Sequence, residues 1–304
     1  MRAARNALVV LVCAAASHGA WAGSLNYCQG QTEPSAATQD RLIQVAAVVK
    51  AELDRSGEAV AIVARSGLAL QHFGHRYSHA GVSLKASPAI PWSVRQLYYA
   101  CDEKRPRIFD QGMSGFVMGA LDPAEGYVSI MLLPHEAAQA LERTALDDQQ
   151  ALRLLGGTYS ANAYAFSKRY QNCNQWLAEL MASAWGTLVT GDDARVEAQD
   201  WLHDQHYSPS TFDLGWGPIA WLAGLLPWLH VDDHPQENIV NAQYKVSMPS
   251  SIEAFVHYRL PEATRIELCY TALHIVVRSG WEAISPGCTP ATGDRVITLA
   301  SLRP

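Results

Sequence analysis

Seven short apolar segments with strand character constrain the fold of this 304-residue chain more than any other feature. Each is rich in β-branched or aromatic side chains and is bounded by turn-forming residues. Four of them lie close together, at residues 59–64, 77–84, 92–99 and 127–133. The other three follow near the end of the chain, at residues 265–270, 274–278 and 295–299. The pattern predicts a small, largely antiparallel sheet over about residues 59–133 and a β-rich C-terminal part.

Segments with apolar side chains at helical spacing fill much of the remaining sequence. Leu42, Val45, Val49 and Leu53 share one face of a helix predicted over residues 38–56. Further helices are predicted over residues 135–145, 148–155, 172–185 and about 193–203. The fold class is therefore α+β, with a small antiparallel sheet packed on helices and a C-terminal α/β extension.

The first 22 residues have the features of a cleaved secretory signal peptide. Arg2 and Arg5 precede a short apolar stretch, and the sequence at residues 20–22 fits the small-x-small cleavage rule. We therefore expect a periplasmic protein that begins near Gly23. Its formal charge is −8, since removing two arginines changes the total of −6. No long basic run is present, so nucleic acid is not an expected partner.

An odd number of cysteines remains after this cleavage, so at least one has no disulfide partner within the chain. The five are Cys28, Cys101, Cys173, Cys269 and Cys288. Exported proteins commonly form disulfides. Pairing Cys269 with Cys288, and Cys28 with Cys101, would leave Cys173 free, although the odd number alone does not fix the pairing.

Cys173 begins one of the predicted helices. Asn172 is a favourable N-cap residue, and Gln175 completes the pattern of a capping box. The unpaired N–H groups and the positive dipole end at a helix start stabilise a thiolate, which is the reactive form of cysteine. We therefore predict a lowered pKa and a nucleophilic role for Cys173. The alternative is that Cys173 is a small buried hydrophobic residue.

His79 lies at the start of a predicted strand, in the sequence SHAGVSL at residues 78–84. Alternation places His79, Gly81 and Ser83 on one side of this strand. The small residues beside the ring leave room for a helix to approach. An imidazole in this position can accept the thiol proton and later protonate the leaving group. We predict His79 as the general base, with a structural, hydrogen-bonded histidine as the alternative.

Together, the two segments resemble the permuted NlpC-type branch of the papain-like cysteine hydrolases, in which the histidine strand precedes the cysteine helix. The matching motifs are SHAGV at residues 78–82 and YQNC at residues 170–173. The chain as a whole resembles an uncharacterised family of exported bacterial proteins. Its marks are RQLYYACD at residues 95–102 and YQNCNQW at residues 170–176.

The resemblance implies a third polar residue that orients the imidazole, usually from the next strand. We predict Gln96 in this role, because a separation of 96 − 79 = 17 residues suits a hairpin return. Asp102 and Arg95 are weaker candidates. Gln96 departs from the His or Glu that is more common at this position, but an amide can also accept the ring N–H.

The resemblance also implies a thiol hydrolase or acyltransferase that attacks an amide or ester bond and forms an acyl-enzyme. Cell-wall peptides are the expected substrates, with lipid or acyl substrates as the other class. The backbone N–H of Cys173 would donate to the oxyanion. The alternative function is an inactive envelope binding module that uses the same groove.

The resemblance, the signal peptide and the predicted elements together divide the chain into four parts. They are a signal peptide at 1–22, an N-terminal helix region at 23–57, a permuted papain-like core at 58–186 and a C-terminal helical and β-rich extension at 187–304.

No cofactor, metal or stable membrane span is expected. His72, His75 and His79 would share a face only on an uninterrupted helix, and a glycine and turn residues interrupt the segment. The apolar segment at residues 214–231 contains several helix breakers, so we predict a packed helix there instead of a span. The sequences KRPR at 104–107 and HVDDH at 230–234 are predicted to be solvated loops.

Overall fold

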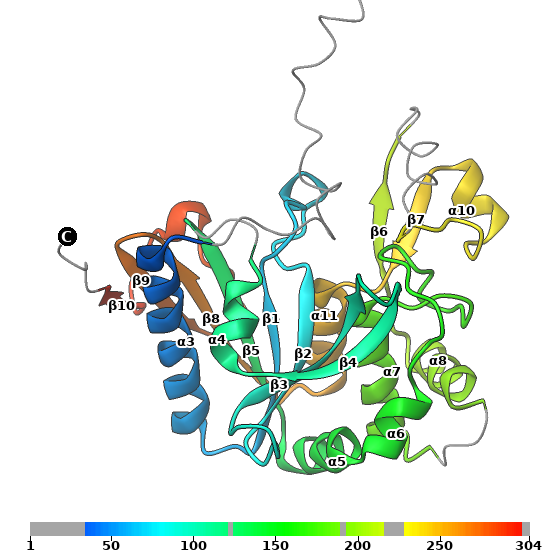
Figure 1. The fold of residues 1–304 in the computed structure, drawn as a ribbon, viewed down its shortest axis with the longest axis horizontal. Helices are drawn as coiled ribbons and strands as arrows, with labels where there is room; N and C mark the ends of the chain where they lie inside the picture. Colours follow the sequence, from blue (N-terminus) through cyan, green and yellow to red (C-terminus); the bar gives the residue numbers. More distant parts are fainter. Residues whose placement is uncertain (1–33, 121–123, 189–192, 216–227, 300–304) are drawn as a thin grey trace, which may run out of the picture. The chain divides into compact units, whose positions relative to one another are not determined.

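The computed structural model describes residues 34–120, 124–188, 193–215 and 228–299 (Figure 1). Among these residues, eight strands form one sheet in the order β10-β9-β8-β5-β1-β2-β3-β4, and all neighbours are antiparallel. The strands are β1 (Val60–Arg65), β2 (His79–Leu84), β3 (Ser93–Ala100), β4 (Arg105–Gln111), β5 (Gly126–Leu132), β8 (Thr264–Tyr270), β9 (His274–Ser279) and β10 (Arg295–Thr298). The predicted α+β class with an antiparallel sheet is confirmed.

The sheet is larger than the predicted one, because the C-terminal strands extend it. β8 pairs with β5 along its whole length, with Gly126 opposite Tyr270 and Leu132 opposite Thr264. The predicted strands of residues 59–133 and those of residues 265–299 therefore share one sheet.

One edge strand, β4, was not predicted. It begins at Arg105, so the prediction of a solvated loop over residues 104–107 is wrong. β4 pairs with β3, with Pro106 opposite Tyr99. A proline lacks the backbone N–H, but an edge strand tolerates that loss.

The helices occur in the positions that the sequence predicted, with additions. The α-helices are α3 (Ala36–Ser56), α4 (Met113–Met118), α5 (His135–Leu146), α6 (Asp148–Arg153), α7 (Cys173–Trp185), α8 (Ala194–Asp204), α10 (Gln236–Val240) and α11 (Pro249–Arg259). Two short 3₁₀ turns are η1 (Gln71–Phe73) and η2 (Pro286–Cys288). A separate hairpin pairs β6 (Ser210–Asp213) with β7 (Gln243–Val246). Of these, α4, α10, α11 and the hairpin were not predicted.

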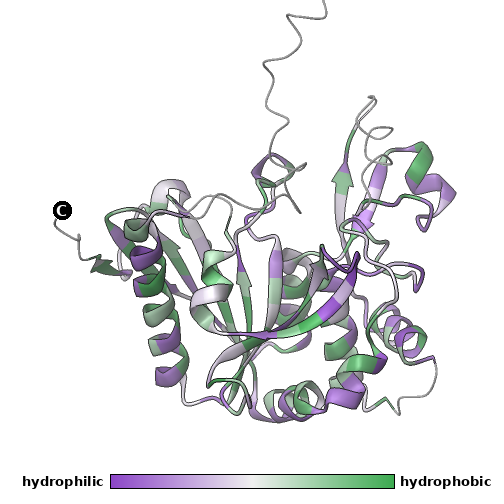
Figure 2. Ribbon diagram, in the orientation of Figure 1, coloured by the Kyte–Doolittle hydropathy of each residue, from purple (hydrophilic) through white to green (hydrophobic). Residues whose placement is uncertain are grey.

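Helices cover both faces of the sheet, and the first face carries α3 and α4. The apolar side of α3 packs with Ala61 and Val63 of β1, and with Phe116 of α4. Leu42 and Val45 of this helix are fully buried, as its spacing predicts. Figure 2 shows hydrophobic and hydrophilic residues alternating along α3.

The second face carries α5, α6 and α7. Arg95 of β3 lies on this face, because its neighbour Val94 packs in the core of the first face. Its guanidinium donates to the carbonyl oxygen of Ala145 in α5 at 2.6 Å. Trp176 of α7 donates to the Ala151 carbonyl oxygen of α6 at 3.2 Å. α7 is therefore packed beside these helices and against β2 and β3 (Figure 1).

A buried carboxylate fixes the segment that leads into β2. Glu267 of β8 is fully buried and accepts hydrogen bonds from Arg76 at 2.8 Å, from the Ile284 N–H at 2.6 Å and from the Tyr77 hydroxyl. It also forms an ion pair with Arg265 at 3.1 Å. Burial opposes ionisation, but the Arg265 charge and these bonds hold the pKa of Glu267 below its usual value. The two residues at 76–77 are therefore held to β8 just before His79.

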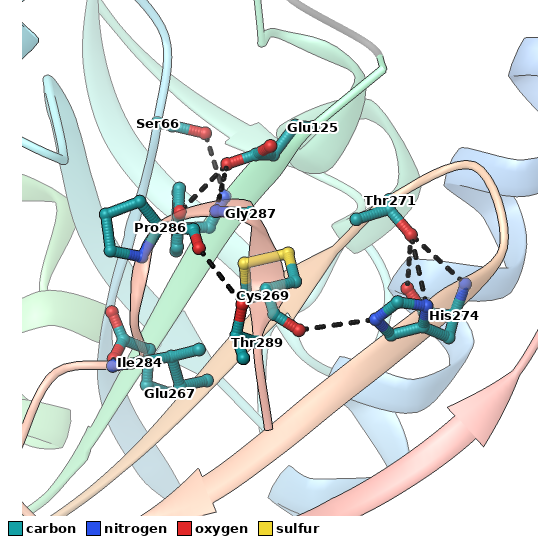
Figure 3. The surroundings of a disulfide bond; sticks show 12 residues. Ser66, Glu125, Glu267, Cys269, Thr271, His274, Ile284, Pro286, Gly287 and Thr289 are labelled. Atoms are coloured by element: carbon teal, nitrogen blue, oxygen red, sulfur yellow. Dashed lines mark hydrogen bonds between the residues drawn. A yellow bond between two sulfur atoms is a disulfide. The ribbon is translucent and has the colours of Figure 1, made fainter. Parts of the chain in front are cut away.

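A disulfide between Cys269 of β8 and Cys288 of η2 closes the C-terminal part of the chain (Figure 3). The sequence analysis gave this pairing as one possibility, and the structure contains it. Beside it, the Gly287 N–H donates to Glu125 at 3.3 Å, which ties η2 to the segment before β5. Cys101 is also disulfide-bonded, and its predicted partner, Cys28, lies outside the described residues.

The double substitution Cys269→Ala and Cys288→Ala should lower the free energy of unfolding by about 3 kcal/mol. The bond joins residues 19 apart, and its loss frees the unfolded chain from that closed loop. Urea denaturation followed by circular dichroism measures the change. A loss below about 1 kcal/mol would show that packing and the Glu125 contact alone hold η2 in place.

Candidate functional site

Cys173 is the first residue of α7 and the free cysteine among the residues that the structure describes. The Asn172 side chain accepts a hydrogen bond from the Gln175 N–H at 2.7 Å, so the predicted N-cap is confirmed. The reciprocal half of the capping box is not formed. Instead, Gln175 donates to carbonyl oxygens in the loop at 164–167, and this fixes the loop to the first turn of α7.

The start of α7 is joined to the start of β2. Asn174 donates from its side chain to the Ser78 carbonyl oxygen at 3.2 Å, and Ser78 directly precedes His79. The Asn172 amide donates to the carbonyl oxygens of Ala161 and Ser247 at 3.2 and 3.4 Å. These bonds hold the residues on both sides of Cys173.

The ring of His79 is fixed by an amide pair on neighbouring strands. His79 Nε2 lies 2.6 Å from Gln96 Oε1, and Gln96 Nε2 donates to Gln111 Oε1 at 2.6 Å. Because the amide oxygen can only accept, Nε2 carries the ring proton and Nδ1 remains as the basic nitrogen. The structure thus brings His79 and Gln96 together, and Gln96 is fully buried. Of the weaker candidates, Arg95 lies on the second face and Asp102 is exposed in a turn.

His79 faces α4, not α7. Its ring centroid lies 4.8 Å from that of Tyr98 and 6.1 Å from that of Phe116 in α4. Gly81, the small residue that follows on this face of β2, allows β3 to pack closely against β2. A Cβ atom there would lie 2.8 Å from the Arg95 carbonyl oxygen, so this space does not admit a helix.

The segments that carry the thiol and the imidazole meet, but the two side chains are not bonded to each other. Cys173 belongs to a helix on the second face, whereas His79 points to the first face, and the two elements meet at the end of β2. Within the described ranges, no hydrogen bond joins Cys173 Sγ to the His79 ring. The hydrogen bond from Asn174 to Ser78 joins the two segments.

Burial makes both groups neutral. Desolvation raises the pKa of Cys173 to about 12. The backbone N–H of Asn174 and the charge of Arg65 favour the thiolate and oppose this rise, but they do not outweigh it. The predicted lowering of this pKa is therefore wrong for the enclosed site. Desolvation and the Arg65 charge lower the pKa of His79 to about 3, although the bond to Gln96 opposes the shift. At neutral pH the site holds a thiol and a neutral imidazole.

Arg65 and Tyr98 were missed by the sequence analysis. Arg65 ends β1 opposite His79, and its guanidinium donates to the Tyr98 hydroxyl at 2.8 Å. A basic residue closing an otherwise apolar buried strand was the signal that could have identified it.

The three histidines at 72, 75 and 79 do not come together. His75 Nδ1 lies 3.0 Å from Ser250 Oγ, and His79 is bound to Gln96. In the described parts of the chain, one group of three possible ligands converges, and two of them are the disulfide sulfurs of Cys269 and Cys288.

The HVDDH segment at residues 230–234 forms a loop, as predicted, but it is partly enclosed instead of solvated. Asp233 accepts from the Tyr164 N–H at 2.9 Å, and His234 Nε2 lies 2.8 Å from the Asn162 carbonyl oxygen. Both side chains are buried against the loop that leads to α7.

The described helices include none with the length and apolar character needed to cross a bilayer. Most of the apolar segment at 214–231 lies outside the described residues.

Comparison with known proteins gave one match. A family model described as "Uncharacterized protein conserved in bacteria (DUF2145)" matches residues 52–256. No curated protein matches the chain. No solved structure matches it either.

Burial of the neutral His79 ring should make stability depend on pH. The ring titrates near 3 when folded and near 6.5 in the reference state, so acid favours the unfolded chain. The contribution of the neutral His79 ring to the free energy of unfolding is fully present above about pH 6.5 and is lost as the pH falls toward 3. Urea denaturation between pH 7.5 and 4 should give wild type a slope steeper than that of His79→Gln by up to about 1.4 kcal/mol per pH unit.

The same substitution at His203, whose side chain is 77 % exposed, is the matched control. Parallel curves for wild type and His79→Gln would contradict a buried, neutral ring.

Proposed function

We propose a function for this chain, which belongs to the DUF2145 family of bacterial proteins: it is an exported thiol hydrolase or acyltransferase that uses Cys173 and His79. Its substrates are amides or esters, with cell-wall peptides first among them. The order of a histidine strand before a cysteine helix is that of the permuted papain-like hydrolases. We also propose that residues 58–186 form a permuted papain-like core and that the protein lies in the periplasm.

One observation carries the proposal. The free cysteine begins a capped helix whose second residue, Asn174, is bound to Ser78, the residue before His79. Helix-start N–H groups lie beside the sulfur, and Gln96 holds the ring so that Nδ1 is its basic nitrogen. These are the parts that nucleophilic acyl transfer requires.

The chemistry follows from these parts once the thiol and ring meet. His79 Nδ1 takes the Cys173 proton as sulfur adds to the carbonyl carbon. The N–H groups of Cys173 and Asn174 donate to the oxyanion. Collapse breaks the bond to the leaving group, which takes the proton from the ring, and a thioester remains. Water or another acceptor then attacks the thioester and gives its proton to His79. The C–S bond breaks, the acyl product leaves, and the ring returns the proton to the Cys173 sulfur.

The enclosed site must open before this reaction. In the closed arrangement the thiol is neutral, and the ring lies on the far side of the end of β2. Entry of substrate, with a shift of the α7 start toward the ring that Gln96 holds, would bring the two together. Partial hydration would also return both pKa values toward their usual range.

A non-catalytic envelope module is the second candidate. The same burial and the lack of a recorded Cys173–His79 bond in the described residues favour this alternative. Its groove would bind a peptide or glycan without covalent chemistry.

Cys173→Ala should abolish turnover and the covalent adduct, because no thioester can form without the sulfur. Purified protein is incubated with a mixture of cell-wall peptide fragments, and products and protein mass are followed by mass spectrometry. Wild type should show product and a hydroxylamine-labile adduct on Cys173. Ser183→Ala, a small change at a buried residue of the same helix, is the matched control and should retain activity.

If wild type shows neither turnover nor an adduct with cell-wall peptides, phospholipids and acyl esters, the proposed enzymatic function is refuted. Full biological activity of Cys173→Ala in cells would instead establish the binding module.

A further inference from the structure

Arg65 is a buried cation without a carboxylate partner among the described residues. It is 5 % exposed. The other buried arginines each pair with a carboxylate: Arg95 with Asp110, Arg195 with Glu179, Arg265 with Glu267, and Arg278 with Asp294. A buried charge is unfavourable unless it is paired, so this exception calls for an anion.

The guanidinium of Arg65 is held in place by neutral acceptors. Nη1 donates to the carbonyl oxygens of Ser66 at 3.0 Å and Gly119 at 2.7 Å, and Nη2 donates to the Tyr98 hydroxyl at 2.8 Å. Its flat face lies over the Phe116 ring, 5.4 Å from the centroid. A Cβ atom at Gly119 would lie 2.7 Å from Cζ, so a glycine there leaves space for the group.

These bonds leave part of the guanidinium unused. Of its five N–H donors, three are taken, and Nε is buried without a partner. Nε–H and one Nη2–H remain. Two N–H groups on one planar cation suit the two oxygens of a carboxylate.

Arg65 stands beside the proposed reacting groups. It is opposite His79 in the register of β1 and β2, and both side chains face α4. The start of α7 meets the same end of β2 through Asn174 and Ser78. The Arg65 charge also reaches the Cys173 thiol, because it favours the thiolate there.

We propose that Arg65 binds a carboxylate of the substrate next to the bond that Cys173 attacks. This proposal rests on the proposed thiol chemistry and narrows its substrates to acyl compounds that carry a carboxylate near the reacting carbonyl. Arg65 acts as a specificity-determining residue.

Alkylation with two reagents of equal size tests the proposal. Iodoacetate carries a carboxylate and iodoacetamide does not, so the ratio of their rates with Cys173 reports anion binding and cancels the cost of opening the site. Rates are measured by intact-protein mass spectrometry at pH 7.5, with Cys173→Ala to subtract other labelling and glutathione as the free-thiol reference. The wild-type ratio should exceed that of glutathione by about tenfold, which corresponds to one charge-assisted hydrogen bond.

Arg65→Gln should return the ratio to the glutathione value. Arg169→Gln is the matched control, because Arg169 lies four residues before Cys173 but is exposed and paired with Asp232. It should keep the wild-type ratio. If Arg65→Gln does not fold, as judged by circular dichroism, Arg65→Lys serves instead and should reduce the ratio, since an ammonium offers no fixed pair of donors.

The outcomes separate the two proposals. A Cys173 that reacts with both reagents, at a ratio equal to that of glutathione or unchanged by the Arg65 substitution, overturns the carboxylate site and leaves the thiol chemistry intact. A Cys173 that reacts with neither reagent in the folded protein contradicts the thiol chemistry and the carboxylate site together.

Discussion

Desolvation decides the chemical state of the candidate site. The helix start and the Arg65 charge both favour a Cys173 thiolate, yet enclosure raises the pKa of that thiol to about 12. The same enclosure, with the same arginine, keeps His79 uncharged. Local helix effects contribute at most a few kcal/mol, and burial of an unpaired ion costs more than that. Cys173 and His79 are therefore both uncharged while the site is closed, and any activation of the thiol must come with water or substrate.

The polar contacts around β2 explain why this neutral site keeps a fixed geometry. Glu267 binds Tyr77, and Asn174 binds Ser78, so two consecutive residues before His79 are held from β8 and from α7. Gln96 then holds the ring itself. Because Glu267 is fully buried, its hydrogen bonds cannot be exchanged for water without a large penalty. The start of β2 and the ring that it carries are thus both held by specific hydrogen bonds.

The sequence predicted the local features well and the long-range ones poorly. The strand at residues 79–84 and the Asn172 cap follow from short-range rules, and both are observed. The pairing of β8 with β5 joins residues more than a hundred positions apart, which no local pattern specifies. The His79–Gln96 contact could be predicted from the sequence, because it spans one hairpin. The sequence could not show on which face of the sheet α7 packs, because small residues beside His79 admit a neighbouring strand as readily as a helix.

Burial of Cys173 also affects how its thiol can remain reduced. Cys101, Cys269 and Cys288 are all disulfide-bonded, whereas Cys173 is a free, buried thiol. Thiol–disulfide exchange and oxidation proceed through the thiolate, and a buried thiol that titrates near 12 contains almost none at neutral pH. A nucleophile exposed beside Arg65 would be reactive toward every oxidant. A closed site that ionises its sulfur only when a substrate enters and admits water would keep Cys173 reduced until then.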